Sequence, residues 1–145
     1  MGKINMGRVV VGVLLAGLVI NAGEFVLNMP ILGNMWNAAM EALHRPPIDT
    51  EPPVFFILLS FGLGLLTVYV YAAIRPRFGA GPLTAICAGL IVWALASLYA
   101  SAALLPLRLF PGRLLLYACV WEFFELPIAA LAGCWIYREE SEQRA

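Results

Sequence analysis

The stretch 114-LLLYACVWEFFELPIAALAGCWI-136 decides how the chain folds. It is longer than the roughly 20 apolar residues that a helix needs to cross a membrane, yet it carries Glu122, Glu125 and Pro127 near its middle. A charged acid at that depth costs about 2.5 to 3.5 kcal/mol on insertion scales, so both acids should face protein or a polar cavity. The stretch therefore predicts a membrane-spanning helix with a polar site on one side.

The composition points to the same class of protein. Of the 145 residues, 62% are hydrophobic and 12% are charged, whereas soluble domains have about 25% charged residues. The formal net charge of +0 argues against nucleic acid as a partner, because such proteins present a basic face. Cys87, Cys119 and Cys134 fall in apolar runs without the spacing of a metal or disulfide motif, which favours packing roles. We therefore expect an integral protein of the lipid bilayer.

Three further apolar runs complete the predicted architecture. The expected spans are residues 9–29, 54–74, 83–105 and 114–136. Residues 31–43 are apolar on one helical side and polar on the other, which predicts a short amphipathic helix on the membrane surface with Trp36 at headgroup level. Residues 138–145 form a charged tail. The sequence thus predicts an all-α fold in which residues 1–145 form a single membrane domain, a four-helix transmembrane bundle with a surface helix after the first span.

Four spans place both termini on the same side of the membrane. One side of the membrane would carry the termini and the turn between the second and third spans, with the basic residues Lys3, Arg8, Arg75, Arg77, Arg138 and Arg144. The other side would carry Arg45, Arg108 and Arg113. Because cytoplasmic segments are enriched in lysine and arginine, this distribution predicts cytoplasmic termini.

A polar stripe on the first span complements the acids of the fourth. Gly17, Asn21, Glu24 and Asn28 follow a spacing of i, i+4, i+7 and i+11, which places them on one helical face. With a rise of about 1.5 Å per residue, Glu24, Glu122 and Glu125 should lie within roughly 10 Å of one another in depth. If the first and fourth spans are neighbours, the candidate proton or ligand site consists of Glu24, Glu122, Glu125, Asn21 and Asn28.

The protonation of this site follows from its surroundings. No lysine, arginine or histidine lies in the interior of a span, and both desolvation and mutual repulsion favour the neutral form of a carboxyl group. We expect at least one acid to be protonated at neutral pH. Pro127 leaves the carbonyl of Phe123 without its amide donor, so it is one acceptor for such a proton. Hydroxyl partners are expected among Ser60, Thr67, Ser97, Ser101 and the tyrosines.

Three classes of function remain open. The first is a binding or transport protein that uses the acids for a proton or a cationic small molecule. In the second, an accessory or scaffold subunit, the acids only fix helix packing or meet a second copy or another membrane protein. A membrane enzyme is third, because His44 is the only histidine and no Ser/His or Cys/His arrangement occurs in the spans. We predict no catalytic residue, no cofactor and no metal site, with a hard cation on the three glutamates as the outside alternative.

The chain also resembles an uncharacterised family of small bacterial membrane proteins with four predicted spans. The features that carry the resemblance are Gly7-Arg8, NAGEFVLN at 21–28, Trp36 to Met40, AAIRPRFG at 72–79, Trp121, Glu125-Leu126-Pro127 and ALAG at 130–133. The resemblance implies a bacterial inner-membrane protein, assigns no activity, and marks Glu24, Asn28, Trp36 and Glu125 as matching the pattern. Glu122 stands where a small residue is expected.

Overall fold

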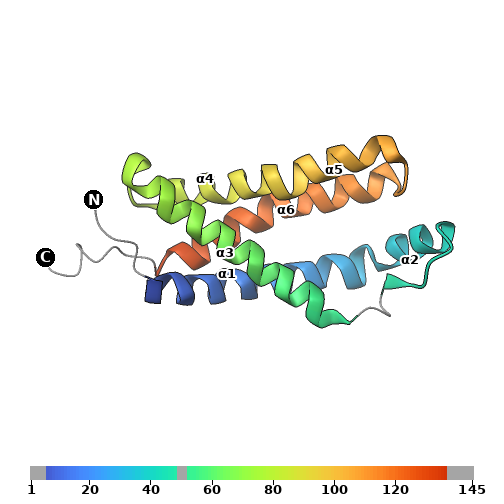
Figure 1. Ribbon diagram of the computed structural model, residues 1–145, viewed down its shortest axis with the longest axis horizontal. Coiled ribbons are helices and arrows are strands. Elements are labelled where there is room, and N and C mark those ends of the chain that lie inside the picture. The colour runs from blue at the N-terminus through green and yellow to red at the C-terminus, as the bar shows by residue number, and fades with distance from the viewer. Residues whose placement is uncertain (1–5, 49–51, 137–145) are drawn as a thin grey trace, which may run out of the picture.

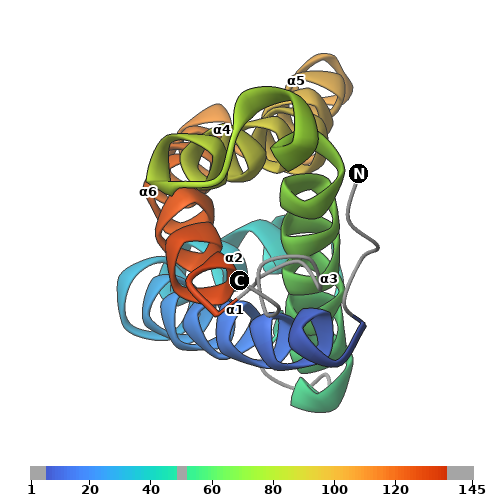
Figure 2. The ribbon, with the colours of Figure 1, turned by 90° about the vertical axis from the view of Figure 1, so that its left-hand side faces the viewer.

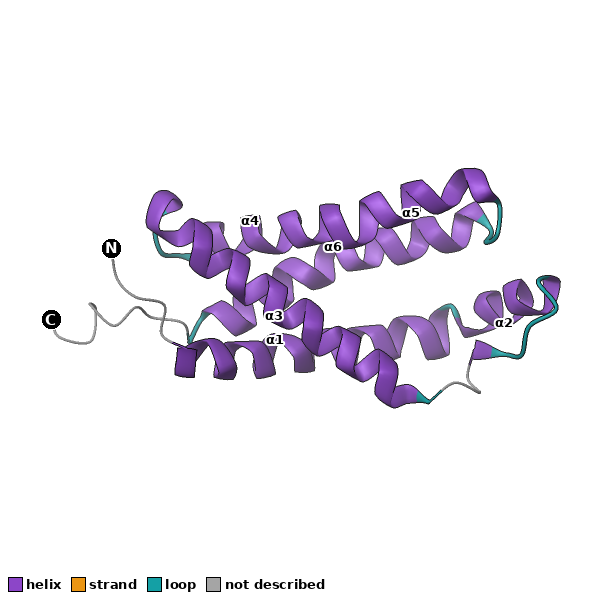
Figure 3. Cartoon of the chain, viewed as in Figure 1, coloured by secondary structure: helices purple, strands orange, loops and turns teal. Residues whose placement is uncertain are grey.

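The computed structural model describes residues 6–48 and 52–136, and these ranges fold into helices without a strand (Figures 1 and 3). The elements in chain order are α1 Met6–Val26, the π turn η1 Leu27–Ile31, α2 Gly33–Ala42, α3 Pro53–Phe78, α4 Pro82–Trp93, the π turn η3 Ala94–Leu98, α5 Tyr99–Leu104, the 3-10 turn η4 Leu105–Leu107 and α6 Gly112–Cys134. The predicted all-α fold is confirmed.

Four helical stretches are long and apolar enough to cross a membrane. They are Gly7–Ile31, Pro53–Phe78, Pro82–Leu107 and Gly112–Cys134. The second continues beyond the predicted end at residue 74, because the helix passes through Pro76 and ends only at Gly79, whose φ of 86° suits glycine. Arg75 and Arg77, expected in a turn, therefore lie in the last turn of α3, where their charges complement the helix dipole. The predicted tail at 138–145 lies outside the described residues.

The four long stretches surround a common interior (Figure 2). Helix α1 packs against α3 and α6, α4 packs against the same two helices, and α6 also contacts α3. The first and last described residues lie at one end of the bundle, where Arg8 Nη1 donates to the carbonyl of Ile136 at 3.3 Å. We call the half that contains this end the near half, and the half that contains α2 the far half.

Glycines allow the helices to approach closely in the near half and the middle. A Cβ atom on Gly133 of α6 would lie 2.6 Å from the carbonyl oxygen of Gly12 in α1, and a Cβ on Gly64 of α3 would lie 2.8 Å from a backbone nitrogen of α1. A Cβ on Gly89 of α4 would lie 2.7 Å from the Cα of Pro127. Small residues permit such backbone contacts, which associate helices in membranes where the hydrophobic effect does not.

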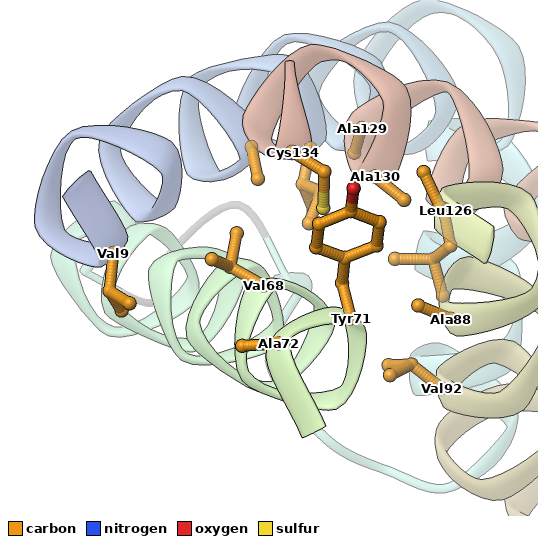
Figure 4. Packing of buried hydrophobic residues seen from close by; sticks show 13 residues of the cluster. Val9, Val68, Tyr71, Ala72, Ala88, Val92, Leu126, Ala129, Ala130 and Cys134 are labelled. Atoms are coloured by element: carbon orange, nitrogen blue, oxygen red, sulfur yellow. The ribbon is translucent and has the colours of Figure 1, made fainter. Parts of the chain in front are cut away.

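The main apolar core occupies the near half and the middle of the bundle (Figure 4). The ring of Tyr71 extends from α3 between Leu126, Ala130 and Cys134 of α6, and its hydroxyl accepts the amide proton of Gly81 at 3.4 Å. Of the three cysteines expected to pack inside, Cys119 and Cys134 are buried, whereas Cys87 is exposed on α4. All three are free thiols.

A second, smaller cluster closes the far end. Helix α2 follows η1 after Leu32 and continues in the general direction of α1 (Figure 1). The buried residues of this cluster are Leu27, Leu32, Ala39 and Leu114. The ring of Trp36 meets the ring of Phe110 edge to face with 5.6 Å between centroids. Helix α2 is thereby fixed against the turn that precedes α6, and its position at a membrane surface stays a prediction.

Candidate functional site

The carboxyl groups of Glu24 on α1 and Glu125 on α6 face each other. They meet because α1 and α6 are neighbours, which was the condition that the sequence left open. Gly23 makes the approach possible, because a Cβ atom there would collide with Glu125 Oε1 and would lie only 2.8 Å from its Cδ. The Glu125 side chain thus lies over the backbone of α1 in a space that exists only because residue 23 has no side chain.

The Glu125 carboxyl group is buried and has no satisfied hydrogen bond. The residue is 7% exposed, and neither of its oxygens has a hydrogen-bond partner of normal geometry among the described residues. The indole Nε1 of Trp121, one helical turn earlier and beside Glu125, is buried without a partner as well. Buried polar groups are nearly always paired, since an unpaired one costs about 1 to 3 kcal/mol. The indole N–H of Trp121 and the carboxyl group of Glu125 thus lie side by side in the bundle without a hydrogen bond of normal geometry between them.

Glu24 is connected to α2 through two hydrogen bonds in series. Asn28 Nδ2 donates to Glu24 Oε2 at 2.6 Å and to the Glu24 backbone carbonyl at 3.0 Å. Asn28 Oδ1 in turn accepts the indole proton of Trp36 at 2.8 Å. The N–H of Trp36, a residue expected at headgroup level, thus points inward to the acid site. The series ties the orientation of the Glu24 carboxyl to the position of α2.

Glu122 has its own partner on a different helix. Ser97, which is 5% exposed, donates its hydroxyl proton to Glu122 Oε2. Next to this contact, Trp93 Nε1 donates to the carbonyl of Cys119 at 2.9 Å, and the ring of Trp93 packs edge to face against Phe123 at 5.0 Å. The three acids are near enough to interact electrostatically with one another.

Both side-chain donors to the acids lie on π turns. Asn28 belongs to η1, which also contains Pro30, and Ser97 belongs to η3. A π turn holds one residue more than an α-helical turn and changes the direction in which the following side chains project, and such turns occur frequently at functional sites. Asn28, at the start of η1, reaches Glu24 at the ordinary i, i+4 spacing, whereas Ser97 lies near the end of η3, whose wide turn sets the direction in which it projects toward α6.

The other predicted residues lie elsewhere. Asn21 donates to the carbonyl of Gly17 at 2.8 Å and to that of Ile57 at 3.5 Å, so it lies between α1 and α3 rather than beside the acids. Ser60 and Thr67, expected as partners of the acids, donate to carbonyls within α3. The structure thus brings together Glu24, Asn28, Glu122 and Glu125 of the predicted site.

Two residues of the site lay outside the predicted set. Trp121 was predicted to face lipid or pack in the core, with a place in a cavity wall as the alternative, and Gly23 was quoted only within the stretch 21–28. Their positions carried a signal, since Trp121 precedes Glu125 by one helical turn and Gly23 precedes Glu24 directly.

Charge and donor types limit what the site can bind. Lysine, arginine and histidine are absent between Arg8 and His44, between Arg77 and Arg108, and between Arg113 and Arg138. The described residues contain no group of three side chains from His, Cys, Asp or Glu placed to hold a metal ion. The arrangement can accept protons and hydrogen-bond donors.

Comparisons with known proteins add no assignment. No family model, no curated protein and no solved structure matches the chain.

Proposed function

We propose that the chain is a small membrane protein that binds or transports a proton or a cationic small molecule at a protonatable site formed by Glu24 and Glu125, with Glu122 beside them. The observation that carries this proposal is the Glu125 carboxyl group, buried opposite a second acid with both oxygens unpartnered among the described residues. An acid that only fixed helix packing would be expected to have its oxygens satisfied by donors.

Electrostatics supports a site that holds an exchangeable proton. Two unit charges 4 Å apart repel by about 4 kcal/mol at an effective dielectric constant of 20, so two facing carboxylates bind a proton or a cation between them. The hydrogen bond from Asn28 stabilises the charged form of Glu24, so Glu125 is the acid of the pair expected to hold the proton.

The proposed location is the bacterial inner membrane with cytoplasmic termini. The family resemblance supports the membrane, and the excess of basic residues near the termini and the second turn supports the orientation. Three of those basic residues, Lys3, Arg138 and Arg144, lie outside the described residues.

The alternative is an accessory or scaffold subunit, and one observation favours it. At the start of α3, residues 53–59 are exposed on every side, including Phe55 at 61% and Leu58 at 64%. Lipid can cover this surface, but so can a second copy or another membrane protein. Under this alternative, Glu125→Gln lowers assembly or folded yield rather than proton binding.

The test is a pH titration of the protonated-carboxyl infrared band of the purified protein in lipid. We expect a band that titrates and that is lost in Glu24→Gln or Glu125→Gln, while the exposed Glu41→Gln control on α2 keeps it. A wild-type band that never titrates would mean a sealed acid and would refute the transport function.

A further inference from the structure

Resting on the proposed function, we infer that the ligand of the Glu24–Glu125 site is a small organic cation that carries N–H donors, a primary ammonium rather than a quaternary ammonium. The site has a surplus of acceptors. Its three carboxyl groups present six oxygen atoms, and among the described residues Asn28 and Ser97 donate a side-chain hydrogen bond of normal geometry to them, one to Glu24 and one to Glu122. Both oxygens of Glu125 lack a hydrogen bond of normal geometry, with the carboxyl group of Glu24 and the indole N–H of Trp121 as their polar neighbours.

The basic residues of α1 and α6 are distant from the acids along their helices. The basic residues that share a helix with the acids, Arg8 and Arg113, lie in the first turns of α1 and α6. Arg113 is roughly 18 Å before Glu125 along the helix. Because no basic side chain of these helices comes near the acids, a ligand that brings both a charge and several donors matches what the site lacks.

The aromatic residues argue against a quaternary ammonium. Such ions are held by the open faces of aromatic rings. Here the ring of Trp93 packs against Phe123 and the ring of Trp36 packs against Phe110, while Trp121 meets Glu125 through its indole N–H. A primary ammonium instead offers three N–H donors on a compact centre, which suits the unpaired oxygens of Glu125.

Binding of such a cation should displace a proton. The titratable groups that face the site are Glu24 from α1 and Glu122 and Glu125 from α6, with the Cys119 thiol close to Glu122. The titratable residues of the other packed elements are Tyr69, Tyr71, Arg75 and Arg77 on α3, Cys87 on α4, Tyr99 on α5 and Glu41 on α2. The cation and the proton therefore compete for the same pair, one entering as the other leaves.

The experiment uses the full chain in lipid bilayers, with methylammonium and tetramethylammonium as probes. We expect methylammonium to reduce the protonated-carboxyl band in a saturable manner and to release about one proton per cation bound, since the two compete for one pair. Tetramethylammonium should need at least about tenfold higher concentration than methylammonium for the same response, because it has no N–H group to donate a charge-assisted hydrogen bond to the carboxylates. Glu125→Gln should weaken the methylammonium response by at least about tenfold, with Glu24→Gln as a second variant and Glu41→Gln as the unchanged control.

The outcomes separate this inference from the function on which it rests. Equal responses to both cations would overturn the inference, as would a band that titrates with pH but ignores methylammonium, and in the second case the protonatable site would stand. A band that does not titrate at all would overturn the proposed function itself. If one glutamine variant fails to fold, the comparison of the two cations on the unmodified protein still decides the inference.

Discussion

Replacing Gly23 by alanine should displace the Glu125 carboxyl group without unfolding the bundle. The added Cβ would lie 2.8 Å from Glu125 Cδ and closer still to Oε1, whereas carbon atoms in contact lie about 3.5 to 4.0 Å apart, so the carboxyl must move by about 1 Å. It is the end of a flexible side chain, and a forced rotamer costs about 0.5 to 1.5 kcal/mol. Alanine regains about 1 kcal/mol of helix propensity over glycine, so the two effects nearly cancel in stability.

The assay combines the thermal unfolding midpoint in detergent with the infrared spectrum in lipid. For Gly23→Ala we expect a midpoint close to that of the unmodified protein and a changed position of the Glu125 carboxyl band, because Glu125 no longer faces Glu24 as before. The matched control is Gly62→Ala on α3, where an added Cβ has nothing within 4 Å, so it should leave the carboxyl band unchanged and raise the midpoint slightly through helix propensity alone. A folded Gly23→Ala protein with an unaltered carboxyl band would refute the packing of Glu125 over α1.

Three other predictions concern packing and hydrogen bonds. Gly133→Ala should lower the folded yield or the unfolding midpoint strongly, because its Cβ would lie 2.6 Å from a backbone oxygen of α1 that cannot turn away; a midpoint near that of the unmodified protein would contradict the contact. Trp36→Phe keeps an aromatic ring but removes the donor to Asn28 and part of the surface that packs on Phe110, which should cost at least about 0.5 to 1.5 kcal/mol of unfolding free energy, and an unchanged value would deny that bond. Ser97→Ala should lower the free energy of unfolding by about 1 to 3 kcal/mol in the unmodified protein, and by much less in a protein that already carries Glu122→Gln. Equal effects in the two proteins would show that the two residues do not interact.

The architecture could be predicted from the sequence because it depends on hydropathy summed over long stretches. Four apolar runs suffice for an all-α membrane fold, and no single contact changes that result. The contact between Glu24 and Glu125 could be predicted only on the condition that the first and fourth spans are neighbours. The order of the helices around the bundle depends on which glycines touch. Gly12 and Gly133 decide that α1 packs on α6, and their roles are visible only when both helices are placed.

The finer features of the site depend on small angular differences. Asn21 and Glu24 share a helical face within one turn of each other, yet the first donates to α3 and the second faces α6, because the face lies between two neighbouring helices. The contact of Ser97 with Glu122 depends on η3, and π turns have no reliable signature in a single sequence. Similarly, the inward N–H of Trp36 follows from η1 and from the position of α2.

The wide turns η1 and η3 make the geometry of the acid site sensitive to chain length as well as to side-chain identity. Deleting Leu95, an exposed residue of η3 that no acid contacts, would allow this turn to close as an ordinary α-helix. Because the turn holds one residue more than an α-helical turn, the helices on either side of the deletion would keep nearly the same relative direction, and the residues inside the turn, Ser97 among them, would change theirs. Ser97 would turn away from Glu122 although neither residue had been replaced. Alignments of relatives of this chain should therefore be read for single-residue gaps at these two turns as closely as for changes at the glutamates.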